Sequence, residues 1–140
     1  MSPELERGDS LPGPGAGSGT TILVVEDEDA LRATIRRLLQ GEGYTVLEAP
    51  NGASALEVLS SAAGAGVALV LTDLRMPVMD GRQFAAALAR VRPNLPIVFM
   101  SGFTAQLVDM RLVSPHLAFL AKPFKNDALL AAVRGQLDRS

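Results

Sequence analysis

The fold is decided by residues 67–81, which read VALVLTDLRMPVMDG. The stretch opens with an apolar run, which is typical of a strand buried on both faces of a parallel sheet. The run ends at Asp73; Pro77 then removes a backbone donor, and Gly81 allows a turn before a helical pattern begins. Asp73 is therefore predicted at the carboxyl end of a central strand. Taken alone, such an Asp is more often a cap of the following turn or helix, so the ends of the other apolar runs must decide.

The composition indicates one globular domain, because the chain has 140 residues, of which 48% are hydrophobic and 20% charged. No apolar run is long enough to span a bilayer, and the N-terminus lacks the apolar segment of a signal peptide. The lack of cysteine excludes disulfides, thiolate metal sites and a cysteine nucleophile. A net charge of −2 and a pI near 5.3 argue against a nucleic-acid-binding surface. We therefore expect a cytoplasmic domain that contacts neither nucleic acid nor membrane.

The chain divides into two parts. Residues 1–19 are rich in Gly, Pro and Ser and are interpreted as a flexible leader or linker, and residues 20–140 as the domain. Within the domain, apolar runs alternate with helical patterns. The expected strands are residues 21–25, 44–48, 67–72, 96–100 and 117–121. This alternation predicts an α/β fold, with a doubly wound five-stranded parallel sheet and five helices on its two faces.

Sequence signals also mark individual helices. Asp29 is expected to cap the first helix and Asn51 the second. The fourth helical pattern covers residues 103–113 and is limited by Pro115, and the last covers about 125–138. Three arginines of the first helix are interpreted as a solvated face: Arg32, Arg36 and Arg37.

Polar side chains follow four of the five strands. They are Glu26 and Asp27, Asp73, Ser101 and Lys122, and the carboxyl ends of parallel strands meet at one edge of the sheet. If the first and third strands are neighbours, three carboxylates converge there, and a cation or an ammonium group would offset their repulsion. An oxygen-only ligand set favours Mg²⁺. Together with a lysine and a hydroxyl group, this set suits phosphoryl transfer with Asp73 as nucleophile.

Four segments, in this order, resemble the receiver domain of bacterial two-component response regulators. They are VVEDE (24–28), DLRMPVMDG (73–81), MSG (100–102) and FLAKPF (119–124), and the resemblance covers residues 21–138. It implies the flavodoxin-like strand order 2-1-3-4-5. It also implies that Asp73 accepts a phosphoryl group from a histidine kinase or a histidine phosphotransfer domain.

The same resemblance implies roles for the other site residues. Mg²⁺ would be held by Asp27, Asp73 and the main-chain carbonyl of Arg75, with Glu26 acting directly or through water. Ser101 and Lys122 would contact the phosphoryl oxygens, and the Lys122–Pro123 peptide bond would be cis.

Two positions depart from the family pattern. Glu26 stands where the family often has Asp, so its mode of binding the metal is open. Phe119 stands at an aromatic switch position where many members have Tyr, so it can pack but cannot donate a hydrogen bond. We expect Ser101 to move toward the new phosphoryl oxygens and Phe119 to fill the vacated space. This change would bias the face made by the fourth helix, the fifth strand and the fifth helix.

The chain ends with the fifth helix, and its segments 100–104 and 117–124 look most like receivers at the C-terminus of hybrid sensor histidine kinases. The leader would then be an interdomain linker, and a stand-alone single-domain regulator is the alternative. The isolated domain is not expected to be an enzyme beyond transferring a phosphoryl group to itself, although its parent chain would be a histidine kinase. A weak homodimer is left open.

Rival functions each meet an obstacle. A phosphatase of the haloacid dehalogenase type needs a second Asp where Arg75 stands. A dinucleotide-binding domain needs a Gly-rich turn after the first strand, where the acidic residues 26–28 would repel a pyrophosphate. The single histidine, His116, does not favour a catalytic triad or a metal role. A pseudo-receiver that is never phosphorylated would typically have lost some of the polar groups that are present here.

Overall fold

The computed structural model describes residues 19–73, 81–101 and 117–139. Its five strands are β1 (Thr21–Val25), β2 (Thr45–Ala49), β3 (Val67–Asp73), β4 (Ile97–Ser101) and β5 (Leu117–Ala121). All neighbouring strands pair in parallel, in the order β2-β1-β3-β4-β5. This confirms the flavodoxin-like sheet expected from the sequence, and it makes β1 and β3 neighbours.

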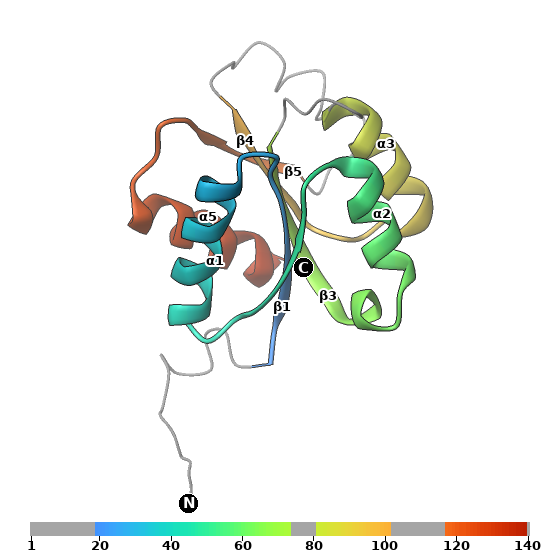
Figure 1. Cartoon of the computed structure of the whole chain (residues 1–140), viewed down its shortest axis with the longest axis horizontal. Coiled ribbons are helices and arrows are strands. Elements are labelled where there is room, and N and C mark those ends of the chain that lie inside the picture. Colours follow the sequence, from blue (N-terminus) through green and yellow to red (C-terminus); the bar gives the residue numbers. More distant parts are fainter. Residues whose placement is uncertain (1–18, 74–80, 102–116, 140) are drawn as a thin grey trace, which may run out of the picture.

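Helices cover both faces of the sheet. They are α1 (Asp29–Gly41), α2 (Gly52–Ser60), α3 (Gly81–Val91) and α5 (Asn126–Arg139), with a short 3₁₀ helix, η1 (Ala63–Gly66), before β3. Figure 1 shows α1 and α5 on one face and α2 and α3 on the other. In the described part of the chain, no helix is long and apolar enough to cross a membrane. Four features from the sequence lie outside the described residues: most of the leader, Arg75, the predicted helix over 103–113, and His116.

Side chains of each strand alternate between two apolar cores, because successive residues of a strand point to opposite faces. On β3, Leu71 belongs to the core that includes Leu39 of α1 and Leu129 of α5. Its neighbour Val70 belongs to the core that includes Phe84 of α3. The middle of β3 is therefore buried on both sides.

The helix starts confirm one predicted cap and correct another. The Asn51 side chain accepts a hydrogen bond of 2.8 Å from the Ser54 backbone N–H and caps α2 as predicted. Asp29 does not cap α1: it is the first helical residue, and Glu28 occupies the cap position without a side-chain cap bond. The Asp29 carboxylate instead pairs with Arg32 at 2.7 Å, one turn into the helix.

The prediction that three arginines form a solvated face of α1 is wrong for two of them. Arg37 is exposed, but the side chains of Arg32 and Arg36 are only 18% and 34% exposed. Both form ion pairs with Glu48 on β2. The cause is the alternation of β2, which turns Glu48 to the same face as Val46, where α1 packs.

Candidate functional site

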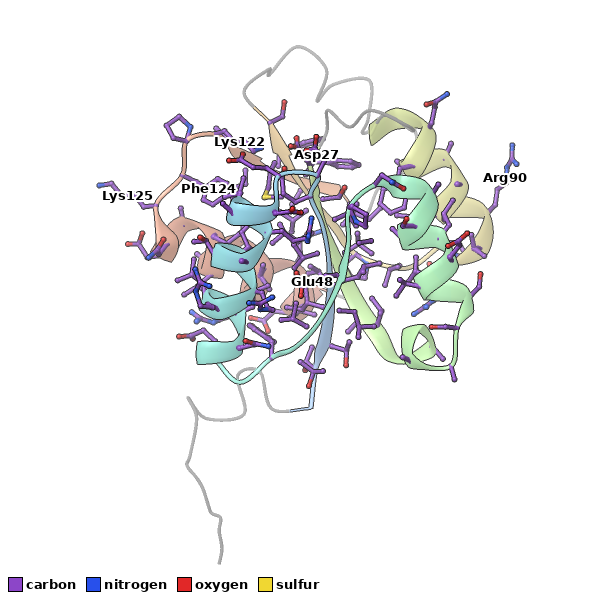
Figure 2. The ribbon with its side chains drawn as sticks, viewed as in Figure 1. Asp27, Glu48, Arg90, Lys122, Phe124 and Lys125 are labelled. Atoms are coloured by element: carbon purple, nitrogen blue, oxygen red, sulfur yellow. The ribbon has the colours of Figure 1, made fainter. Side chains whose placement is uncertain are left out.

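The predicted polar residues meet at the carboxyl edge of the sheet. Glu26 and Asp27 directly follow β1, Asp73 and Ser101 end β3 and β4, and Lys122 follows β5. Figure 2 shows Asp27 and Lys122 at this edge, next to the ends of the strands. The structure thus brings together the described polar residues that the sequence assigned to the site.

Main-chain hydrogen bonds to neighbouring strands hold the two flanks of the site. The backbone N–H of Glu26 donates to the Ala49 carbonyl of β2 at 3.1 Å. On the other side, the backbone N–H of Lys122 donates to the Ser101 carbonyl of β4 at 3.0 Å. The sheet hydrogen bonding therefore continues one residue beyond β1 and β5, and it fixes the backbone from which the Glu26 and Lys122 side chains extend.

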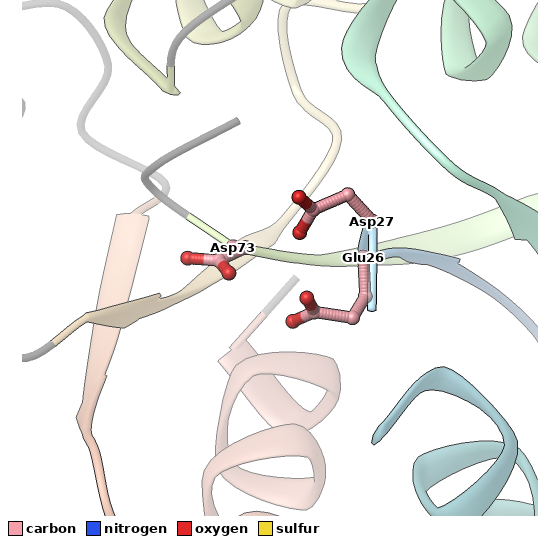
Figure 3. Close-up of side chains that lie close together, drawn as sticks. All are labelled: Glu26, Asp27 and Asp73. Carbon is pink, nitrogen blue, oxygen red and sulfur yellow. The ribbon is translucent and has the colours of Figure 1, made fainter. Parts of the chain in front are cut away.

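Three carboxylates face a common space. Glu26, Asp27 and Asp73 each offer an oxygen, and these oxygens lie within 4.8 Å of one another (Figure 3). Glu26 is 1% exposed and Asp73 is 7% exposed, whereas Asp27 is open to solvent. Two of the three negative charges are therefore largely removed from water, so their repulsion is poorly screened.

Lys122 partly compensates for this repulsion. Its Nζ lies 2.9 Å from Asp73 Oδ2 and 3.5 Å from Glu26 Oε1. Burial would lower the pKa of Lys122, but its hydrogen bond to Asp73 and the negative charges of Asp73 and Glu26 outweigh burial and raise that pKa. The lysine therefore stays charged beside the Asp73 carboxylate.

Glu26 is the least satisfied group of the site. Its Oε2 accepts a hydrogen bond of 3.1 Å from the Glu28 backbone N–H, but its buried Oε1 has no hydrogen-bond partner among the described residues. The ion pair with Lys122, at 3.5 Å, is too long to count as a good hydrogen bond. Burial raises the pKa of Glu26 to about 7, and the charge of Asp73 adds to the rise, against the opposing effects of the Glu28 N–H and Lys122.

A divalent cation would satisfy that buried oxygen. The three carboxylates form an oxygen-only donor set, which hard cations such as Mg²⁺ prefer. The residues present therefore fit a Mg²⁺ ion. The fourth predicted ligand, the carbonyl of Arg75, lies outside the described residues.

The predicted switch residues lie on adjacent strands. Ser101 is 6% exposed at the end of β4. Phe119 is half-buried and lies directly across from Phe99 in the β4–β5 register, with the ring centroids 6.0 Å apart and the planes inclined by 22°. The Lys122–Pro123 peptide bond is cis, as the sequence resemblance implied.

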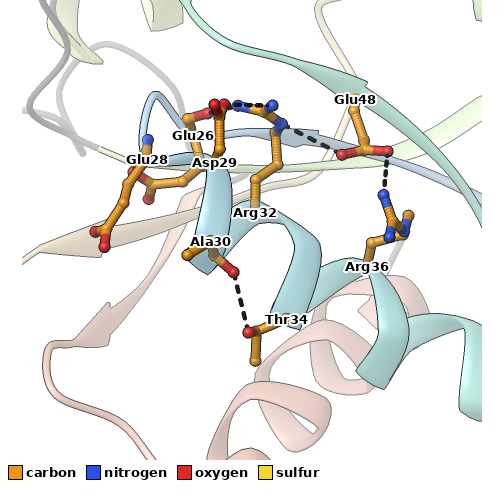
Figure 4. Close-up of polar contacts among 8 residues, drawn as sticks. All are labelled: Glu26, Glu28, Asp29, Ala30, Arg32, Thr34, Arg36 and Glu48. Carbon is orange, nitrogen blue, oxygen red and sulfur yellow. Dashed lines mark hydrogen bonds and ion pairs between the residues drawn. The ribbon is translucent and has the colours of Figure 1, made fainter.

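Sequence reasoning missed the polar network behind the acidic residues (Figure 4). Arg32 reaches the Glu26 carbonyl, and Glu48 joins Arg32 to Arg36. The available signals were a charged residue, Glu48, within a strand that has no other charged residue, and the spacing of the two arginines, which places them one turn apart on α1.

Comparisons with known proteins agree on the family. The model of the response regulator receiver domain matches residues 22–134. The sensor kinase CckA of Brucella abortus is 35% identical over 137 residues, which cover 97% of this chain and 14% of the kinase. The response regulator receiver protein CpdR of the same species is 38% identical over 104 residues, which cover 74% of this chain and 84% of CpdR. The chain thus spans a small part of one relative and most of another.

Solved structures share the architecture. A response regulator receiver protein from Sinorhizobium medicae is 31% identical with a TM-score of 0.76, covering 86% of this chain and 95% of that structure. The signal receiver domain of a signal transduction histidine kinase from Syntrophus aciditrophicus is 25% identical with a TM-score of 0.74, covering 86% and 91%. The similarity therefore extends from the sequence to the arrangement of the whole sheet.

Proposed function

Since this chain belongs to the response regulator receiver domain family, we propose that Asp73 accepts a phosphoryl group in two-component signalling. The observation that carries this proposal is the position of Asp73, whose carboxylate lies 2.9 Å from Lys122 Nζ and faces two further carboxylates. The donor would be a phosphohistidine of a histidine kinase or of a histidine phosphotransfer domain.

In the proposed reaction, a phosphoryl group moves from the imidazole nitrogen of the donor to the Asp73 carboxylate. A carboxylate oxygen of Asp73 attacks the phosphorus, the bond between phosphorus and the donor imidazole nitrogen breaks, and an acyl phosphate forms on Asp73. The imidazole nitrogen leaves with the electron pair of that bond and takes up a proton. Lys122, which pairs with the Asp73 carboxylate before transfer, would then contact the phosphoryl oxygens, and the Ser101 hydroxyl would donate to one of them.

Glu26, Asp27 and Asp73 would hold the Mg²⁺ ion, together with the carbonyl of Arg75. When bound, the ion supplies positive charge that offsets the charge on the transferring phosphoryl group. Glu26 contributes a longer and more buried side chain than Asp27, and its Oε2 is already engaged by the Glu28 N–H. Its other oxygen, Oε1, is therefore the atom that would face the ion.

The output would pass from Ser101 to Phe119 and bias the face that includes β5 and α5. We place the domain in the cytoplasm, where kinases supply the phosphoryl group, and we expect no enzymatic activity from it beyond self-directed transfer. The parent protein would be a hybrid histidine kinase, as the likeness to the sensor kinase CckA suggests. A stand-alone regulator is the second candidate, favoured by the match that covers 84% of the receiver protein CpdR.

Incubation with acetyl phosphate and Mg²⁺ tests the assignment. Intact-mass measurement should find one added phosphoryl group on the parent protein and none on Asp73→Asn, which keeps the shape of the side chain but removes the nucleophilic charge. The acyl phosphate should be lost on treatment with hydroxylamine. Labelling that survives in Asp73→Asn would mean that another residue is the acceptor. No labelling of the folded parent protein would favour a pseudo-receiver that acts through binding alone.

A further inference from the structure

The guanidinium of Arg32 joins three elements behind the acidic site. Its Nη1 donates to the Glu26 main-chain carbonyl at 2.7 Å, its Nη2 pairs with Asp29 Oδ1 at 2.7 Å, and its Nε donates to Glu48 Oε1 at 3.2 Å. These acceptors lie just after β1, on the first residue of α1 and on β2, and Figure 4 shows the three contacts around one side chain.

The other end of this network is also held. The second oxygen of Glu48, Oε2, accepts from Arg36 Nη1 at 3.0 Å, one helical turn after Arg32. The Glu48 carboxylate therefore binds two guanidinium groups. Because the donors of a guanidinium lie in one plane, this contact also orients the Arg32 side chain. Arg32 is also mostly buried, with 18% of its side chain exposed.

The contact with the Glu26 carbonyl bears directly on the acidic residues. That carbonyl belongs to the planar peptide unit that joins Glu26 to Asp27, so holding its oxygen restricts the two backbone rotations beside it. Those rotations aim the Glu26 and Asp27 carboxylates.

We propose that Arg32 is a positioning residue, which holds the turn between β1 and α1 so that the Glu26 and Asp27 carboxylates converge on one cation. This inference rests on the proposed Mg²⁺ site and adds to it a group that never touches the ion. Glu48 supports Arg32, while Arg36 pairs with Glu48 and, among the described residues, has no contact with the turn.

The sign of the effect separates positioning from simple electrostatics. Removing a positive charge near a cation site should strengthen cation binding if charge alone matters, because repulsion is relieved. Removing a group that positions the ligands should weaken binding. The two explanations therefore predict opposite changes in the Mg²⁺ dissociation constant of an Arg32 variant.

The test compares Arg32→Met with Arg36→Met in the whole chain. Each variant loses one positive charge and one ion pair to Glu48. Arg32→Met also loses the contacts with the Glu26 carbonyl and Asp29, so it should lose more thermal stability than Arg36→Met, and Mg²⁺ binding is compared at a temperature where both variants are folded. Mg²⁺ binding, followed through the amide resonances of Asp27 and Glu28, should weaken about tenfold in Arg32→Met, as is typical when a group that orients metal ligands is lost. It should be unchanged or slightly stronger in Arg36→Met.

Arg32→Lys is the second variant, in case Arg32→Met does not fold. A lysine keeps the charge but cannot reach the Glu26 carbonyl and both carboxylates at once, so its Mg²⁺ binding should also weaken. Parent-like or tighter binding in the folded Arg32 variants would overturn the positioning role, as would equal weakening in Arg36→Met. In those cases the parent protein still binds Mg²⁺ and the proposed metal site stands. Failure of the parent protein to bind Mg²⁺ would overturn both.

Discussion

In the middle of β1 and β3, Leu23 and Leu71 are fully buried within the two apolar cores. A few residues further along the same strands, the carboxylates of Glu26 and Asp73 are almost equally buried, at 1% and 7% exposure. The two regions share a sheet and a backbone geometry. They differ in what burial does to the free energy of folding.

In the middle, burial removes apolar surface from water and stabilises the fold. At the carboxyl ends, burial separates negative charges from water and places them near one another, which opposes folding unless a cation joins them. Lys122 alone leaves one buried Glu26 oxygen without a hydrogen-bond partner among the described residues. Stability and function are therefore carried by different residues, and substitutions should separate them.

Leu71→Ala should produce the largest change in stability. It leaves a cavity against residues of α1 and α5, so the free energy of unfolding should fall by about 3 kcal/mol. Urea unfolding measures this fall. Phosphoryl uptake per folded molecule should stay at the parent level. A loss of uptake in the folded Leu71→Ala protein would show that the middle of the strand also shapes the site.

Most of the sheet and part of the site could be predicted because both depend on local pattern and topology. Apolar runs mark the strands, and parallel strands must bring Asp73 and Lys122 to the same edge. The network of Arg32 and Glu48 could not be predicted from the same patterns. It depends on the register that places Glu48 beside Val24, and on which side of α1 faces the sheet.

The contrast between Glu26 and Asp27 also needed the structure. Consecutive residues after a strand diverge, and the backbone of the turn decides which one is buried. Here the N–H of Glu28 binds Glu26 Oε2 and draws that side chain inward, while Asp27 stays open to solvent. Glu28, whose N–H makes this contact, occupies the cap position of α1. Asp29 is therefore the first helical residue and not the cap that the sequence predicted.

Metal-free protein should lose stability as the pH rises, because of Glu26. Its pKa is raised to about 7 in the folded protein, mainly by burial, from an ordinary value of 4.5. Between these values the folded protein holds a proton that the unfolded chain has released, so stability present below pH 4.5 declines as the pH approaches 7. The total loss should be on the order of 3 kcal/mol.

Glu26→Gln is the matched control for this loss. It keeps the size of the side chain but cannot ionise, so the difference in unfolding free energy between Glu26→Gln and the parent protein should grow from pH 4.5 to pH 7 and then level off. Chemical unfolding in the presence of a chelator, at a series of pH values, measures that difference. The contributions of the other titrating groups largely cancel, because both proteins contain them. Parallel stability profiles would mean that the Glu26 carboxylate is not held in a buried, charge-repelling position.

Phe119→Leu should have the smallest effect on stability and tests whether the two regions are fully separate. Phe119 lies within a strand, yet we assign it a part in signalling through its stack on Phe99. Leucine keeps an apolar side chain, so the loss of ring stacking should lower the unfolding free energy by less than about 1 kcal/mol. Leucine is smaller than phenylalanine and cannot fill the space that Ser101 would vacate.

With beryllofluoride as phosphoryl mimic, chemical-shift changes of the backbone amides should spread into α5 in the parent protein but stay near Ser101 in Phe119→Leu. Phe124→Leu, in the opposite core, should leave the spread intact. If the shift changes still reach α5 in Phe119→Leu, another element carries the signal. The interior of the sheet would then have only a structural role.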